Sequence, residues 1–379
     1  MDEYHILDSE CEEFEALVER NGQANSLMNQ MTHLFQLIDS TWDSTYKRHS
    51  MTHVTDSQNR PVKEVETSFS LKLKSLKWIP SKLEGTARLA KGCDLFVESQ
   101  DTQRLMADHV SYIVPPVIKT SSFGRHLGIQ FKVDADFVIS QLLTWSARSS
   151  PESRKPATFV TSIAHMKSIY EYLIDSLPPK RLQELFDHPV IFVPSETGPE
   201  GHFLARQEVR WFDPSGLFDR YRSSLSSLDE EIDGFRVNLK LFYHGLDQAF
   251  VSVARVQAKP DIVDYAELLV QISLTCTLQR ALLDVLLIFS IIGKELTDGD
   301  ELAMKGQLEK VIALIKQNRI IPSKRGRWVE LGDKTMIADD RQLEKLFADK
   351  EELHFVDCGE KLGVGGARFN KGEKQFYVL

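Results

Sequence analysis

The stretch Trp78-Ile79-Pro80-Ser81 is the first of three copies of a short pattern, here named the Pro-Ser motif. The other copies are Phe192-Val193-Pro194-Ser195 and Ile320-Ile321-Pro322-Ser323. In each copy two apolar residues precede Pro-Ser, and a glycine follows a few positions later. Proline interrupts a helix because it lacks a backbone donor and restricts the residue before it. The motif therefore predicts a strand and turn that recur along the chain, and such repetition indicates architecture before chemistry.

An extended segment follows each copy, and the distances between copies differ. The segments contain Asp94-Leu95-Phe96, Glu208-Val209-Arg210-Trp211 and Trp328-Val329-Glu330, with helical patterns of different lengths between them. Unequal spacing argues against a tight solenoid, in which each repeat stacks on its neighbours. The sequence therefore predicts a mixed α/β (α+β) fold in which a small β-rich hairpin unit occurs three times with helical inserts.

These patterns divide the chain into four predicted parts. They are an N-terminal helical segment and linker (1–60), a first β unit plus helices (61–185), a second β unit plus a helical bundle (186–316), and a third β unit with a C-terminal tail (317–379). A chain of 379 residues is long enough for several domains, since about 150 residues make a typical one.

Local patterns near the N-terminus predict one helix, one loop and one strand. Apolar residues recur at three- or four-residue steps, as on one helix face, at Leu27, Met31, Leu34, Ile38 and Trp42. Residues 48–64 are polar and contain a proline, which is typical of a linker or exposed loop. Residues 69–73 alternate between apolar and polar, as a half-buried strand does.

Helical periodicity predicts the remaining helices, and turn residues separate them. These helices cover residues 103–107, 133–145, 163–173, 262–274, 278–292, 302–315 and 342–347. Gly293 and the segment 297–300 are expected to separate the helices 278–292 and 302–315. Further strands are expected at 112–114, 190–193 and 353–356.

Composition and charge limit the classes of protein that the chain represents. Apolar residues make up 42% and charged residues 27% of the sequence, close to an average globular protein. The net charge of −9 argues against broad nucleic-acid binding, which depends on a basic surface. The acidic N-terminus lacks the pattern of a signal peptide, and the apolar stretch 282–292 is too short to span a bilayer. We therefore expect neither a nucleic-acid nor a membrane partner.

Four cysteines are widely separated along the chain, at Cys11, Cys93, Cys276 and Cys358. None forms a Cys-x-x-Cys pair, and this usage is typical of a reducing compartment rather than of a disulfide framework. We therefore expect an intracellular protein, cytoplasmic or nuclear.

Three groups of residues resemble chemical sites, and a structural interpretation is preferred for each. His49 and His53 stand four apart, as two metal ligands on a helix do, but no further ligand pattern accompanies them. Asp339-Asp340 fits a helix N-cap and first-turn acid better than a cation site or paired catalytic carboxylates. Gly363-Val364-Gly365-Gly366 lacks the Gly-Lys-Ser/Thr ending of a phosphate-binding loop and fits a flexible tail.

Serine and tryptophan recur with the Pro-Ser motif. Three equivalent serines fit turn hydroxyls that bond to nearby backbone better than they fit nucleophiles. Trp78, Trp211 and Trp328 are expected to anchor the core of each β unit. The sequence thus predicts no catalytic, cofactor-binding or metal-ligating residue, and no cofactor.

The order of these segments resembles the NO VEIN family. The third copy continues through Asp339-Asp340-Arg341-Gln342-Leu343-Glu344-Lys345-Leu346-Phe347 to Leu353-His354-Phe355-Val356-Asp357-Cys358-Gly359-Glu360, which is similar to that family's succession of motif, acidic helix and apolar strand. The second copy, through Phe212-Asp213, and the first copy follow the same order. The resemblance covers most of residues 65–360, and sacsin-type proteins share this style of repeat.

The resemblance implies a part of such a protein rather than the whole. Members are large and resemble one another in an ATPase-like head of the histidine-kinase/Hsp90 type, with an Asn on a helix and an Asp-x-Gly-x-Gly loop for ATP. This chain has neither pattern and looks like the repeat region alone. We therefore expect a non-catalytic interaction or scaffold module that binds other proteins as part of a chaperone-like assembly. The alternative is an ATP-dependent chaperone or enzyme with an unrecognised nucleotide site.

Overall fold

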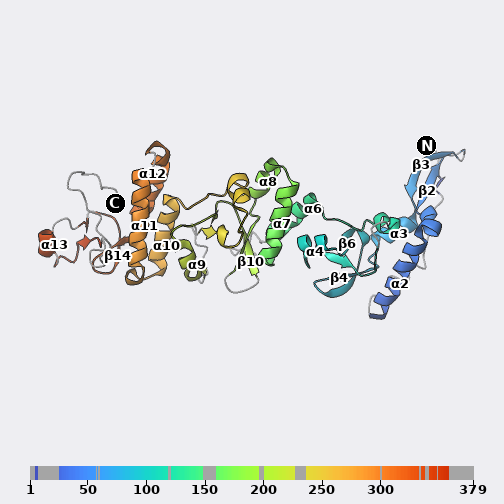
Figure 1. Cartoon of the computed structure of the whole chain (residues 1–379), viewed down its shortest axis with the longest axis horizontal. Helices are drawn as coiled ribbons and strands as arrows, with labels where there is room; N and C mark the ends of the chain where they lie inside the picture. The colour runs from blue at the N-terminus through green and yellow to red at the C-terminus, as the bar shows by residue number, and fades with distance from the viewer. Residues whose placement is uncertain are drawn as a thin grey trace. The chain divides into compact units, whose positions relative to one another are not determined.

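The computed structural model describes residues 5–6, 25–56, 58, 60–117, 121–147, 159–195, 200–226, 236–298, 301–332, 334–337, 341–347 and 349–357. The chain divides into two compact units. Unit 1 is Met1–Gln141 with Ala164–Leu173, and unit 2 is Leu142–Ile163 with Ile174–Leu379. Both units contain helices and small sheets, which confirms the predicted mixed α/β class (Figure 1). The finer division into four parts stays a prediction.

Short strands and helices alternate in unit 1. Its elements are β1 (His5–Ile6), α2 (Asn25–Thr41), β2 (Met51–Thr55), β3 (Pro61–Glu66), α3 (Ser68–Ser75), β4 (Ile79–Leu83), β5 (Thr86–Ala90), β6 (Leu95–Phe96), α4 (Gln100–Met106), β7 (Ser111–Ile113) and α5 (Ser122–His126). The helices α6 (Ala135–Ala147) and α7 (Ile163–Ser176) contribute residues to both units.

Unit 2 contains α11, the longest of the described helices, with 21 residues. Its elements are β8 (Phe159–Val160), α8 (Pro179–Phe186), β9 (Ile191–Pro194), β10 (Glu200–Leu204), β11 (Val209–Arg210), α9 (Leu217–Ser226), β12 (Val237–Asn238), α10 (Ile262–Thr275), α11 (Leu278–Asp298), α12 (Glu301–Gln317), β13 (Ile321–Pro322), β14 (Trp328–Val329), β15 (Thr335–Met336), α13 (Arg341–Phe347) and β16 (His354–Phe355).

The first Pro-Ser motif lies on β4, inside a four-stranded sheet of order β5-β4-β7-β6. β4 is antiparallel to β5 and to β7, whereas β6 is parallel to β7. Glu84 and Gly85 join β4 to β5 with φ angles of 50° and 76°, and a type I′ hairpin turn needs positive φ at both positions. The helix α4 connects the parallel strands β6 and β7, since a tight turn cannot join parallel neighbours.

The third motif has a similar set of strand pairings. β13 is antiparallel to β14, Ser323 forms an antiparallel bridge with Val356, and β15 runs parallel to β16 with α13 between them. Gly326 has a φ of 73° in the turn, and its amide donates to the Ser323 carbonyl at 2.8 Å. These pairings confirm the predicted hairpin at the third copy.

The second motif differs in the neighbours of its hairpin. β9 pairs with β10, and β10 continues to β8, which precedes the motif in the chain. β11 and β12 are parallel, with α9 between them. The three copies therefore share a hairpin followed by a parallel β-α-β connection, but the sheets built around them differ. Repetition of a complete unit stays a prediction.

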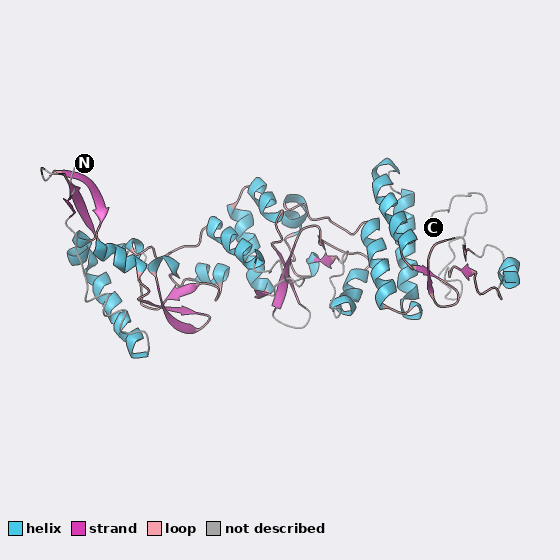
Figure 2. Ribbon diagram, turned by 180° about the vertical axis from the view of Figure 1, so that it is seen from behind, coloured by secondary structure: helices cyan, strands magenta, loops and turns pink. Residues whose placement is uncertain are grey.

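A pair of strands replaces the loop predicted over residues 48–64. β2 and β3 are antiparallel, with a register shift between Val54 and Thr55 (Figure 2). Their β-branched residues favour strands. Their side chains are exposed or half-buried, so no alternation of apolar residues marks them in the sequence. The prediction was wrong because alternation identifies a strand only where one of its faces is buried.

The helix α3 replaces the strand predicted over residues 69–73. The Thr67 hydroxyl caps its start by accepting a hydrogen bond from the Ser70 amide at 3.3 Å. Phe69 and Leu73 stand four apart and are both buried, whereas Leu71 is exposed. The prediction was wrong because five alternating residues also fit a single helical turn, and here the N-cap favours the helix.

The three longest predicted helices of unit 2 are present, and α10 packs against both α11 and α12 (Figure 1). α11 runs through Gly293 to Asp298, so this glycine does not separate two helices as predicted. A Cβ atom at Gly293 would meet nothing within 4 Å. The residue costs helix propensity at an open position, and the packed face of α11 maintains the helix.

Each unit has its own apolar core. In unit 1 the neighbouring rings of Phe35, Trp42, Trp78 and Phe123 have centroids between 4.7 and 6.4 Å apart. Two of these residues lie on or just after α2. Of the predicted stripe, Met31, Ile38 and Trp42 are buried, and Phe35, which was not predicted, is buried with them. In unit 2 the core surrounds α10 with residues from α9, α11, α12 and the third motif. The motif strands are thus parts of cores in both units.

Gly201 in β10 provides a test of this packing. An added Cβ would lie 2.3 Å from the Phe192 ring and 2.5 Å from the Val193 carbonyl oxygen. We expect Gly201→Ala to lower the free energy of unfolding of unit 2 by about 1–3 kcal/mol, because the neighbouring strand must shift. Gly293→Ala should instead raise it by up to about 1 kcal/mol. Urea unfolding, combined with hydrogen exchange of the β9 and β10 amides, measures the stability of both variants. Equal stabilities of Gly201→Ala and Gly293→Ala would contradict the close packing at Gly201.

Candidate functional site

The groups that resemble chemical sites in the sequence are dispersed in the structure. His49 ends the short 3-10 turn Lys47–His49 and His53 lies in β2, so the two do not share a helix face. No cluster of three or more His, Cys, Asp or Glu side chains in the described ranges could hold a metal ion. Asp339, Asp340 and the segment 363–366 lie outside the described residues.

The motif serines fasten their turns. The Ser81 hydroxyl donates to the Arg88 carbonyl at 3.0 Å, and the Ser323 hydroxyl donates to the Arg327 carbonyl at 2.8 Å. Both serines are buried, which denies a substrate access to them. In the second copy the Ser195 amide donates to the Glu200 carbonyl at 2.7 Å. The first and third copies thus use the hydroxyl as a turn group, as predicted.

The three tryptophans have different surroundings. Trp78 is fully buried, and its indole N–H donates to the Leu73 carbonyl at 2.9 Å. Trp211 is buried and stacks on Phe250 with ring centroids 5.9 Å apart. Trp328 is half-buried, donates to the Cys276 carbonyl at 3.1 Å and borders a surface cavity. Trp78 and Trp211 are core residues, whereas Trp328 packs against the core and also lines that cavity.

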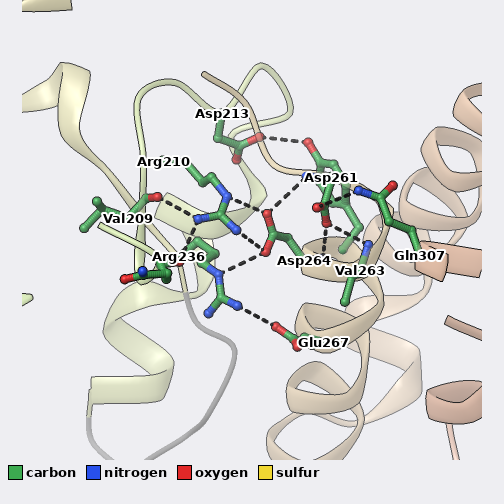
Figure 3. A network of polar contacts seen from close by, with 11 residues as sticks. Val209, Arg210, Asp213, Arg236, Asp261, Val263, Asp264, Glu267 and Gln307 are labelled. Atoms are coloured by element: carbon green, nitrogen blue, oxygen red, sulfur yellow. Dashed lines mark hydrogen bonds and ion pairs between the residues drawn. The ribbon is translucent and has the colours of Figure 1, made fainter. Parts of the chain in front are cut away.

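A buried polar network joins β11 to the start of α10 (Figure 3). The Nε and Nη2 atoms of Arg210 donate to the two carboxylate oxygens of Asp264, each at 2.6 Å. Only 6% of Arg210 and 2% of Asp264 is exposed. A two-point pair of this kind holds both side chains in one geometry, and burial protects it from screening by salt.

Two further donors complete the hydrogen bonding of Asp264. Arg236 Nε donates to Oδ1 at 2.9 Å, and the Asp261 amide donates to Oδ2 at 3.1 Å. Arg236 Nη2 also reaches Glu267 Oε2 at 3.0 Å. Each oxygen of Asp264 therefore accepts two hydrogen bonds from the protein itself. A carboxylate with all its acceptor positions occupied has none left to bind a cation or to take a proton from a substrate.

Helix capping places this carboxylate. Asp261 is the N-cap of α10, and its Oδ1 accepts the amides of Val263 and Asp264 at 2.9 and 3.0 Å. Gln307 on α12 donates to Asp261 Oδ2 at 3.2 Å (Figure 3). The spacing of Asp261 and Asp264 after Pro260 is a capping signal in the sequence. It identifies a helix start, but the distant partner Arg210 cannot be read from it.

The outer members of the network are also held in fixed positions. Asp213 accepts the Tyr265 hydroxyl at 3.1 Å and the Phe218 amide at 3.1 Å, which ties the start of α9 to α10. Burial raises the pKa of the Tyr265 hydroxyl, so tyrosine stays a proton donor. Burial also raises the pKa of Glu267, although the Arg236 guanidinium opposes this shift. The network as a whole suits the joining of helices to strands better than catalysis.

A second polar contact, absent from the sequence candidates, lies in unit 1. Ser70 Oγ and His126 Nε2 share a hydrogen bond of 2.8 Å between α3 and the end of α5. A serine beside a histidine is the basis of many nucleophilic sites. Ser70 is fully buried, however, and the His126 ring packs on Trp42 at 4.8 Å. The pair therefore connects two helices inside the core of unit 1.

Comparisons of the chain with models of protein families, with curated proteins and with solved structures gave no match. None of the described helices combines the length and the apolar character needed to cross a membrane. Cys93 and Cys276, the two cysteines within the described residues, are free thiols.

Asp264→Asn tests the structural role of the network. The change removes the charge that balances Arg210 and Arg236, and an uncompensated buried charge typically costs about 3–5 kcal/mol. We expect a loss of this size in the free energy of unfolding of unit 2, with faster hydrogen exchange in α10. Asp298→Asn is the matched control, because this exposed residue ends α11 and a carboxylate there is slightly unfavourable. A loss of stability in Asp264→Asn no larger than that in Asp298→Asn would contradict a structural role for this network.

The stability of unit 1 should depend on two histidines. Burial, aided by the Lys74 ammonium, lowers the pKa of His126, and burial lowers the pKa of His165 despite its hydrogen bond to Leu105. A histidine with a lowered folded pKa contributes stability above its ordinary value of about 6.5, and this is lost as the pH falls through the folded pKa. Melting temperatures between pH 7.5 and 5.5 should therefore fall with pH.

The variant His126→Gln isolates one of these contributions. Glutamine does not titrate, so the dependence of melting temperature on pH should become shallower in this variant. His188→Gln makes the same substitution at an exposed histidine of unit 2 and serves as the control. An unchanged slope in His126→Gln would show that this histidine does not couple folding to protonation.

Proposed function

We propose that the chain is a non-catalytic protein-interaction or scaffold module, and that its α11 helix receives an apolar helix of a partner protein that carries acidic residues at its ends. The observation that carries this proposal is the exposed face of α11. Leu283 and Leu287, one turn apart, are 57% and 41% exposed. The opposite face, with Val285, Ile288 and Ile292, is buried in the core of unit 2.

The charges on α11 indicate what kind of partner fits. Arg280, Leu283, Leu287, Ser290 and Lys294 follow one another at steps of three or four residues, and all are exposed. They form one stripe with leucines in its middle and a cation towards each end. A helix with apolar residues and acidic flanks would bury the leucines and pair with both cations. This is a frequent mode of recognition between a helix and a protein surface.

Two further observations support a non-catalytic role. The polar network around Asp264 uses both carboxylate oxygens internally, and the serines of the first and third motifs are buried turn groups. Contiguous exposed apolar patches, of which Leu283 and Leu287 would form a part, are typical of interaction surfaces. We also propose that the chain is a NO VEIN-like, sacsin-like repeat region from an intracellular chaperone-like assembly. The recurrence of a hairpin and a parallel β-α-β connection at each motif supports this proposal.

Paired substitutions on α11 test the interaction surface. Partners are recovered by affinity purification with mass spectrometry, purified singly, and titrated against each variant of the full chain. Leu283→Gln combined with Leu287→Gln should weaken a direct partner by about tenfold or more, because two buried leucines are lost from the contact. Leu346→Gln changes an even more exposed leucine, on α13, and should have no effect. Melting temperatures must match among all three proteins.

Several outcomes would overturn the proposal. Partners that bind the double variant as tightly as the wild type would exclude the α11 face. A dimer of the chain that dissociates in the double variant would make this face a self-association surface instead. Clear micromolar ATP binding by calorimetry of the purified chain would favour the alternative, an ATP-dependent chaperone or enzyme.

A further inference from the structure

A surface cavity of about 420 Å³ lies beside the third Pro-Ser motif. Its lining includes Arg319, Arg327, Trp328, Glu330, Lys334 and His354. A cavity of this size falls within the range of small-ligand sites, about 300–1,000 Å³. We propose that this cavity binds a carboxylate or phosphate group on an acidic segment of a partner protein. The proposal rests on the interaction function above and assigns it a second contact surface.

Ion pairs inside the lining leave one cation without a counterion. Arg319 and Glu330 pair at 2.8 Å through side chains that are mostly exposed, which makes the pair weak. Lys334 and Glu352 pair at 3.5 Å, but both side chains are mostly exposed, so this pair is weak. The guanidinium of Arg327 makes no hydrogen bond or ion pair with another described residue. The described lining therefore presents an arginine whose donors are available to an anion.

The hairpin fixes the backbone from which Arg327 extends. The Ser323 hydroxyl and amide both donate to the Arg327 carbonyl, at 2.8 and 3.0 Å. The Arg327 amide donates back to Ser323 Oγ at 3.2 Å. Such fixation lowers the entropy lost when a ligand binds, because only the side chain has to be ordered. A planar guanidinium also matches carboxylate and phosphate oxygens at two points.

In the first motif the arginine at the corresponding position, Arg88, has a partner within the protein. There the Ser81 hydroxyl donates to the Arg88 carbonyl, as Ser323 does to Arg327. The guanidinium of Arg88, however, donates to the hydroxyl of Ser111. An arginine thus stands opposite the motif serine in both hairpins, and an internal partner is present only in the first. The difference leaves the Arg327 guanidinium without a partner among the described residues, so it is available to an external anion.

Trp328 lines the same cavity as Arg327. Its indole N–H is held by the Cys276 carbonyl at 3.1 Å, and the ring packs against the core of unit 2. A fixed aromatic surface beside a cation is typical of sites that bind a peptide side chain by its apolar stem and its charged end. The net charge of −9 repels acidic ligands elsewhere, so a bound acidic peptide requires a local site such as this one.

Fluorescence anisotropy of labelled peptides on the full chain tests the proposal. The probes are a glutamate-rich decapeptide, the same peptide with phosphoserines, the same peptide with glutamines, and a single-stranded RNA decamer. We expect one or both acidic peptides to bind, and Arg327→Gln to weaken binding by about tenfold, since a charge-assisted hydrogen bond is lost. Arg104→Gln, an exposed arginine on α4 in unit 1, makes the same change in charge and should leave binding unchanged.

The acidic peptide that binds more tightly tells whether carboxylate or phosphate is the preferred group. Equal loss in Arg327→Gln and Arg104→Gln, or no binding of either acidic peptide, would overturn the proposal. Binding of the RNA that depends on Arg327 would overturn it in favour of a nucleic acid. If partner binding still depends on Leu283 and Leu287 while the acidic peptides do not bind, the proposal for the cavity is wrong and the interaction function stands. If both surfaces fail, the interaction function fails as well.

Discussion

The carboxylate of Asp264 is the group on which the arrangement of unit 2 depends. It lies in the first turn of α10 and is paired with Arg210 from β11 and with Arg236 next to β12. These contacts attach a parallel strand pair to the helix at the centre of the core. A buried charge is tolerated only when its partners are all in place, so these side chains must assemble together. The network therefore connects β11 and β12 to α10, and an incomplete network would strongly destabilise unit 2.

The complete hydrogen bonding of Asp264 also explains why this network is unsuited to catalysis. A reactive carboxylate needs an open acceptor position, and Asp264 has none. Arg327 is the opposite case, because its backbone is fixed and its guanidinium is without a partner among the described residues. The contrast separates polar groups that complete the fold from those that remain available for binding. On this basis we place the proposed interaction surfaces of the protein on α11 and beside the third motif.

Regular periodicity with clear boundaries was sufficient to predict much of the secondary structure. The helices α10, α11 and α12 were expected from apolar residues at helical spacing, and the third hairpin from its Pro-Ser motif and glycine turn. The strands β2 and β3 were missed because neither has a fully apolar face. The helix α3 was missed because its short segment fits either period. The wrong predictions thus concern segments whose local pattern does not distinguish a helix, a strand and a loop.

Short-range signals in the chain specify turns, caps and helix faces, since each depends on residues within a few positions of one another. The capping pair Asp261 and Asp264 is an example, and so is the serine that closes each described hairpin of the first and third motifs. Packing between distant segments determined which side chains became hydrogen-bonding partners. It brought Arg210 to Asp264 across more than fifty residues, gave Arg88 an internal acceptor and left Arg327 without one among the residues that the structure describes. The physical reason is that a side chain's hydrogen-bonding partners depend on which distant segments share its surroundings, and local spacing contains no record of them.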